Sequence, residues 1–162
     1  MDFSAWGGLI AAWPTDWIII GALATFIALD SLRSGTARAA AIMLSLPGAL
    51  LVTKALPDAV FLGPLADQLT APFVQAAIFM VIAVLLYLVA HRAIFAFSDG
   101  GGVVQSGIAG VAAVIVLVVV WLQVPALESL WFFGDQVHAV FDEAYRFWWL
   151  VLSYAALAFV RS

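Results

Sequence analysis

Few side chains in this sequence could support acid–base or metal chemistry. The chain has two histidines, His91 and His138, and no cysteine. Thiolate metal sites and disulfides are therefore excluded. Paired axial haem ligation would need both imidazoles on one iron. His91 lies near the cytoplasmic end of the third predicted membrane span, and His138 lies beyond the fourth on the opposite side, so a bilayer thickness of ~30 Å should separate them. We therefore expect no haem and no other cofactor.

Acidic residues near the C-terminus are the second candidate for chemistry. Asp135, Asp142 and Glu143 could suggest a hard-cation site, but their spacing lacks the alternating ligands of an EF-hand loop. A spacing of seven puts Asp135 and Asp142 on one helical face, which favours a solvated acidic face. The glycines at 100–102 lack the lysine and hydroxyl residue that complete a phosphate-binding loop. Because no set of polar residues converges at one depth, we expect no enzyme activity.

The composition indicates a chain that is solvated by lipid. Of its 162 residues, 66% are hydrophobic and only 10% are charged. A soluble domain typically has about a quarter of its residues charged, to cover its surface. The net charge of −4 and the six scattered basic residues argue against nucleic acid, because phosphate binding needs clustered Lys and Arg. The sequence predicts an integral membrane protein whose partners include the lipid bilayer but no nucleic acid.

Four apolar stretches are long enough to cross a membrane as helices, since a span takes roughly 20 apolar residues. The predicted fold class is all-α, a polytopic transmembrane helix bundle that forms one domain over residues 1–162. The predicted spans are 17–32, 39–56, 72–97 and 103–124. Residues 1–16 precede them as an interfacial segment, with tryptophans at headgroup level. Region 130–162 is either an amphipathic helix in the interface or, as we favour, a region with a short fifth span.

Two features inside or beside the spans could mark a transport path. Pro47 and Gly48 lie in the middle of the second span and predict a kink there. A broken-helix binding site would need strongly polar neighbours, which this span lacks, so a structural kink is favoured. Asp30 and Arg33 are three residues apart at a span end, where we expect them to pair locally and to mark the membrane boundary.

Basic residues are divided unevenly between the two sides of the membrane. Alternation of four spans puts Arg33, Arg38 and Arg92 on one side, and Lys54 and Arg146 on the other. Short cytoplasmic loops are enriched in Lys and Arg. The pattern predicts a multi-pass protein of the bacterial inner membrane, with its N-terminus outside and the loop that carries Arg33 and Arg38 in the cytoplasm.

Small residues recur at helical spacing in two of the spans. In the helix of the second span and just before it they are Ala37, Ala41, Ser45, Ala49 and Thr53, and in the fourth span Ser106, Gly107 and Gly110. Such patterns let helices approach closely, so that dispersion contacts drive their association in lipid. We predict that these residues pack helices together, either within the bundle, which is favoured, or between subunits.

Two stretches resemble the colicin V production (CvpA) family of small bacterial inner-membrane proteins. The first is DWIIIG at 16–21, followed by Arg33, Gly35 and Arg38, and the second is SGIAG at 106–110 after a glycine-rich turn. The adjacent Arg-Gly pair of that family is separated here by Ser34. The resemblance implies about four spans and an accessory role in secretion or envelope stress, with no known chemistry to transfer.

The sequence favours a non-catalytic accessory or scaffold subunit of a larger membrane assembly, whose partners are other membrane subunits or further copies of itself. The alternative is a pore-forming or carrier protein, including a holin-like or virion membrane protein. That alternative needs a polar path, for which Gln75, Gln105 and Gln123 are candidates, although all three lie near span ends. An intramembrane enzyme is the least favoured class.

Overall fold

The computed structural model describes residues 14–56, 71–94 and 102–160, and every regular element within these ranges is a helix. The helices are α2 (Thr15–Ser34), α3 (Ala37–Ala55), α4 (Pro72–Ile94), α5 (Val103–Trp121), α6 (Pro125–Glu128), α7 (Asp135–Val140) and α8 (Glu143–Val160). Most of the predicted interfacial segment, the end of the third predicted span and most of the glycine-rich turn lie outside the described residues.

Four of the described helices, α2, α3, α4 and α5, are long and apolar enough to cross a membrane. The shortest have 19 residues, which corresponds to about 28 Å at the helical rise and nearly matches the ~30 Å hydrocarbon layer. The predicted all-α bundle with four spans is confirmed, and the chain is a multi-pass membrane protein.

The fourth predicted span ends earlier than expected, at Trp121 instead of residue 124. Pro125 occupies the first turn of α6, and Val124 before it is extended, with φ −113° and ψ 98°. The ring of a proline disfavours helical geometry in the preceding residue. The backbone therefore leaves α5 before Pro125 and begins a new short helix there.

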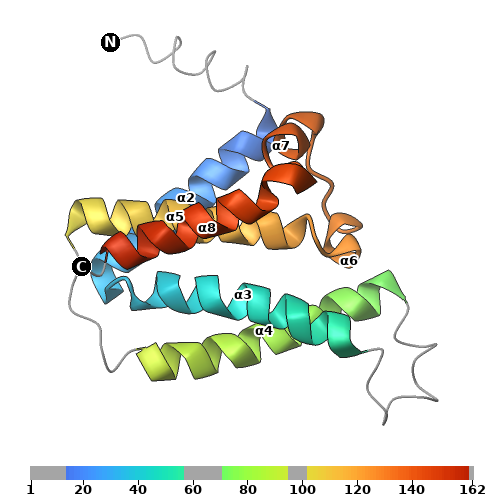
Figure 1. The fold of residues 1–162 in the computed structure, drawn as a ribbon, viewed down its shortest axis with the longest axis horizontal. Helices are drawn as coiled ribbons and strands as arrows, with labels where there is room; N and C mark the ends of the chain where they lie inside the picture. Colours follow the sequence, from blue (N-terminus) through green and yellow to red (C-terminus); the bar gives the residue numbers. More distant parts are fainter. Residues whose placement is uncertain (1–13, 57–70, 95–101, 161–162) are drawn as a thin grey trace.

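α5 is the central helix of the bundle (Figure 1). α2, α3 and α8 pack against it, whereas α4 packs mainly against α3. Along α5, Ala109, Ala113 and Val116 are completely buried. The outer helices instead expose large apolar side chains, including Phe26 of α2 (71% exposed) and Phe73 of α4 (74%). Apolar surface of this extent is unusual in a soluble monomer but is what acyl chains contact in a bilayer.

α8 runs alongside α5 in the opposite direction (Figure 1). One hydrogen bond also joins it to α3, where the Tyr154 hydroxyl donates to the Met43 carbonyl at 2.7 Å. Pro47 lies inside α3 and has no N–H, so the carbonyl four residues earlier, that of Met43, loses its helical donor. α8 thus supplies the donor that the proline removed, and α3 continues through Pro47 to Ala55.

Candidate functional site

The small residues of the second span lie where α3 meets its neighbours. Ala37, Ala41, Ser45 and Ala49 are buried, and Thr53 is half-buried. α3 packs against both α4 and α5. A Cβ added at the neighbouring Gly48 would lie 3.2 Å from the Leu86 Cδ1 of α4. The small volume of these α3 residues lets the backbone of α3 lie close to both α4 and α5.

Gly110 lies at a close contact between α5 and α2. A Cβ added there would lie 2.8 Å from both the Cβ and the backbone nitrogen of Ala28, and 2.9 Å from the carbonyl oxygen of Ala24. Backbone atoms cannot move away as the end of a flexible side chain can, so a larger residue would force the helices apart. Ser106, one turn earlier, is completely buried.

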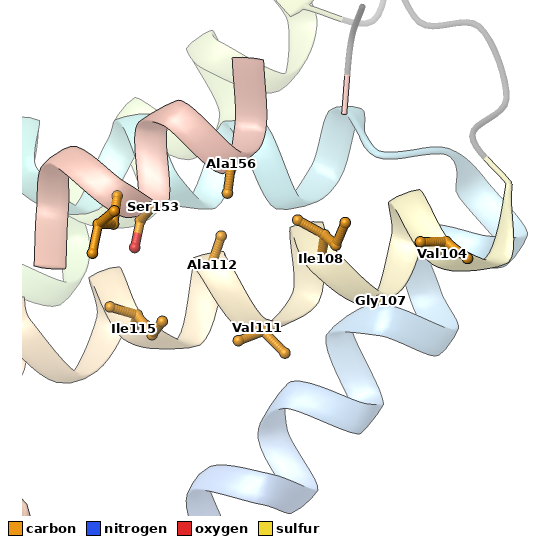
Figure 2. Close-up of a pocket in the computed structure, with 9 residues that line it drawn as sticks. Val104, Gly107, Ile108, Val111, Ala112, Ile115, Ser153 and Ala156 are labelled. Atoms are coloured by element: carbon orange, nitrogen blue, oxygen red, sulfur yellow. The ribbon is translucent and has the colours of Figure 1, made fainter. Parts of the chain in front are cut away.

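Gly107, in contrast, faces open space, because an added Cβ would meet nothing within 4 Å. It lines an apolar groove of about 500 Å³ between α5 and α8. The lining residues are Val104, Gly107, Ile108, Val111, Ala112 and Ile115 of α5, and Leu152, Ser153 and Ala156 of α8. Figure 2 shows Ser153 and Ala156 facing Ala112, so small residues occupy the contact between the two helices.

The groove has no group that could do acid–base chemistry. Its one polar side chain, Ser153, donates its hydroxyl to the carbonyl of Trp149 at 2.8 Å. Val104 and Val111 at its rim are 73% and 52% exposed, so the groove lies open on the outer surface of the bundle. An open apolar groove in a membrane helix bundle can receive acyl chains or another helix.

One end of the bundle carries Arg33, Arg38 and Arg92, at the end of α2, the start of α3 and the end of α4. Asp30 pairs there with Arg38, whose Nη1 lies 2.8 Å from Oδ1. The expected local pair with Arg33 is not among the ion pairs of the described residues. Gly35, with φ +82°, reverses the chain within two residues and sets the first turn of α3 beside the last turn of α2.

The opposite end of the bundle is held by hydrogen bonds that the sequence pattern does not predict. The Nε1 atoms of Trp121 and Trp149 donate to the carbonyls of Trp131 and Val140, at 3.1 and 2.8 Å. The backbone N–H of Gly134 donates to Asp16 Oδ2 at 2.6 Å, across 118 residues of sequence. The one signal in the sequence is the placement of tryptophans near span ends, a pattern that is equally typical of contact with lipid headgroups.

The titratable residues singled out in the sequence are dispersed or engaged in local contacts. Asp142 Oδ1 accepts a hydrogen bond from the backbone N–H of Ala144 at the start of α8. His91 lies in the last turn of α4 and His138 in α7, at opposite ends of the bundle (Figure 1). Within the described ranges, no group of three or more His, Asp or Glu side chains could hold a metal ion.

No protein-family model, curated protein or solved structure matches this chain. The resemblance to the CvpA family therefore stays a prediction that rests on the two sequence stretches.

Proposed function

We propose that this protein is a non-catalytic integral membrane protein, an accessory or scaffold subunit of a larger membrane assembly. The observation that carries the proposal is the apolar groove between α5 and α8, open on the outside of the bundle and lacking an ionisable side chain. We infer that its occupant is a transmembrane helix of another subunit.

The chemistry of the groove supports a helix as its occupant. Helices associate in lipid chiefly by dispersion contacts, so a partner must approach closely over several turns. Gly107 leaves the surface of α5 without a side chain, and Ala156 of α8 adds only a methyl group. Val104, Val111 and Leu152 extend the apolar contact on both helices. A helix could therefore pack against both α5 and α8 without desolvating a charge.

Filling the groove tests the proposal. The protein is extracted into native nanodiscs, and native mass spectrometry determines how many protein chains each particle holds. We expect a species of defined stoichiometry with more than one chain for wild type, and its loss in Gly107→Trp. Gly21→Trp is the matched control, because Gly21 is exposed on α2 and also has nothing within 4 Å of an added Cβ.

Two results would contradict the proposal. The first is a wild-type protein that is strictly monomeric in every nanodisc preparation. The second is equal dissociation by the Gly107 and Gly21 variants, which would show that a bulky residue anywhere on the lipid-facing surface has the same effect.

We also propose the orientation that the sequence predicts, in the bacterial inner membrane with the N-terminus outside. The three arginines at one end of the bundle support a cytoplasmic position for that end. The course of α8 along α5 and the bond from Tyr154 to α3 support a fifth crossing, which would put the C-terminus on the same side as Arg33.

The pore or carrier alternative receives less support from the positions of its candidate residues. Gln75 lies in the first turn of α4, Gln105 accepts a hydrogen bond from the N–H of Gly102 at the start of α5, and Gln123 follows the end of α5. Glutamines confined to helix ends do not form a polar path through the hydrocarbon layer.

A further inference from the structure

A second cleft, of about 620 Å³, lies at the end of the bundle opposite the three arginines. It is formed where the last turn of α3 meets the end of α5, α6 and the first turns of α8. Its lining residues are Lys54, Leu122, Gln123, Pro125, Glu128, Glu143, Arg146, Phe147 and Leu150. It shares no residue with the groove between α5 and α8 and serves no part of the proposed subunit contact.

The cleft has two cations and two carboxylates among its lining residues. The Arg146 side chain is only 15% exposed, and its Nε donates to the Phe141 carbonyl at 3.0 Å. Its Nη1 lies 3.7 Å from the carboxylate of Glu143, a long pair with a side chain that is 87% exposed. The guanidinium has five N–H donors in all, so it keeps donors for a ligand.

The balance of charge indicates what kind of ligand the cleft would bind. Lys54 and Arg146 suit a phosphate, and Arg can bind one through two parallel N–H bonds. Glu128, whose side chain is 27% exposed and whose Oε1 lies 3.8 Å from His138 Nε2, and Glu143 suit an ammonium group. The four side chains together are formally neutral, so a zwitterion complements them better than an anion does.

The position of the cleft indicates where that zwitterion comes from. Lys54 and Arg146 lie in terminal turns of α3 and α8, and such turns stand at headgroup depth when a helix spans the hydrocarbon layer. Leu122, Phe147 and Leu150 form an apolar wall. Phe147 is 64% exposed and belongs to the same α8 surface as the exposed Val151. A lipid headgroup could thus enter the cleft while its acyl chains follow α8.

We propose that this cleft binds the phosphoethanolamine headgroup of a membrane phospholipid. Its phosphate is held by Lys54 and Arg146, and its ammonium N–H groups donate to the carboxylates of Glu128 and Glu143. A quaternary choline group has no N–H to donate, so phosphatidylcholine loses the second half of the interaction. Phosphatidylglycerol carries no ammonium and brings a net negative charge toward two carboxylates.

Native mass spectrometry of the delipidated protein, titrated with each lipid, tests the proposal. We expect phosphatidylethanolamine to bind about tenfold more tightly than phosphatidylcholine or phosphatidylglycerol, which corresponds to one lost charge-assisted hydrogen bond. Arg146→Gln and Glu128→Gln should each remove this preference. Arg92→Gln is the matched control, because Arg92 is an exposed arginine at the other end of the bundle. If Arg146→Gln fails to fold, Glu128→Gln decides the question, because this change keeps the size of the side chain.

Equal binding of the three lipids, or a preference for phosphatidylglycerol, would overturn the proposal, as would an unchanged preference in folded Glu128→Gln.

Competition with soluble phosphoethanolamine distinguishes a lipid headgroup from the free zwitterion. If it displaces the lipid at equal concentration, the ligand is the free zwitterion and the assignment to a phospholipid is wrong. None of these outcomes depends on how many protein chains are in the particle, so this test and the groove test fail independently.

Discussion

At the scale of single residues, the unusual feature is a proline inside a membrane helix whose lost hydrogen bond is replaced by another helix. Pro47 leaves the Met43 carbonyl without its helical donor, and the Tyr154 hydroxyl lies 2.7 Å from that oxygen. An unsatisfied carbonyl is costly in hydrocarbon because no water can reach it. Tyr154 of α8 therefore replaces the backbone hydrogen bond that Pro47 removes from α3.

Replacing Tyr154 by Phe should lower the free energy of unfolding by about 1 kcal/mol, the usual contribution of such a bond. In a Pro47→Ala background the same change should cost much less, because an alanine at this position has a backbone N–H that can donate to the Met43 carbonyl. SDS-induced unfolding in mixed micelles, followed by circular dichroism, measures both effects. Tyr145→Phe is the control, since Tyr145 is 59% exposed on α8. Additive effects of the Pro47 and Tyr154 changes would argue against this compensation.

At the scale of helices, the contact between α2 and α5 is one of the two most extensive in the bundle, together with that between α3 and α4. α2 is mostly exposed to lipid and has few buried residues, of which Ile27 and Ser31 are two. α2 packs mainly against α5, and Gly110 provides the space for their backbones to approach. Two glycines three residues apart on α5 thus differ in role, since Gly107 faces the open groove.

Gly110→Ala should reduce the free energy of unfolding by about 1–3 kcal/mol, the typical cost of overpacking. The added methyl group would press on backbone atoms of α2 at 2.8–2.9 Å. Gly107→Ala should be neutral or slightly stabilising, because alanine favours helix and its methyl group meets nothing. The same unfolding assay compares the two variants. A Gly110→Ala protein as stable as wild type would show that the α2–α5 contact can relax.

The segment that carries α7 is attached to α2 by one charge-assisted bond. Asp16 Oδ2 accepts the N–H of Gly134 at 2.6 Å, immediately before α7 begins. Asp16→Ala should raise amide hydrogen exchange in α7 by about 10- to 100-fold, since a hydrogen bond to a charged group contributes roughly 1.5–3 kcal/mol. Exchange in α5 should not change. Unaltered exchange at α7 would mean that the tryptophan hydrogen bonds suffice to hold it.

At the scale of the whole molecule, charge is asymmetric along the bundle axis. One end carries three arginines, and the other combines Lys54 and Arg146 with acidic residues of α6, α7 and α8. Between the two ends, α2, α3, α4 and α5 are long and apolar enough to cross a hydrocarbon layer. This arrangement is that of a bundle whose helices cross the bilayer. The proposed direction of insertion rests on the arginines.

The absence of cysteine makes the orientation directly testable. In intact cells, a cysteine at Gln136, which is exposed in α7, should react with a membrane-impermeant maleimide. A cysteine at Ser34 should react only after the membrane is permeabilised. The reverse pattern would invert the topology. An alkaline phosphatase fused to the C-terminus should be inactive if α8 crosses to the cytoplasm, and active if α8 lies in the outer interface.

The sequence by itself determined that this protein is solvated by lipid, that its fold is all-α, and where its four spans approximately begin and end. Each of these depends on local composition, because a long apolar stretch must satisfy its backbone polar groups within its own helix when it lies in lipid. The small residues could also be located from their spacing, but their neighbours could not. Gly110 and Gly107 have the same residue type in the same helix, and only the tertiary arrangement assigns one to a helix contact and the other to an open groove.

The polar contacts between distant segments were likewise decided only by the tertiary structure. Tyr154 with Met43, Gly134 with Asp16 and the cleft that joins Lys54 to Arg146 all connect residues far apart in sequence. No periodic pattern encodes such pairs, because each depends on how the helices cross and how far each one is rotated about its axis. Packing fixes these two variables, and with them the groove and the charged cleft on which both proposals rest.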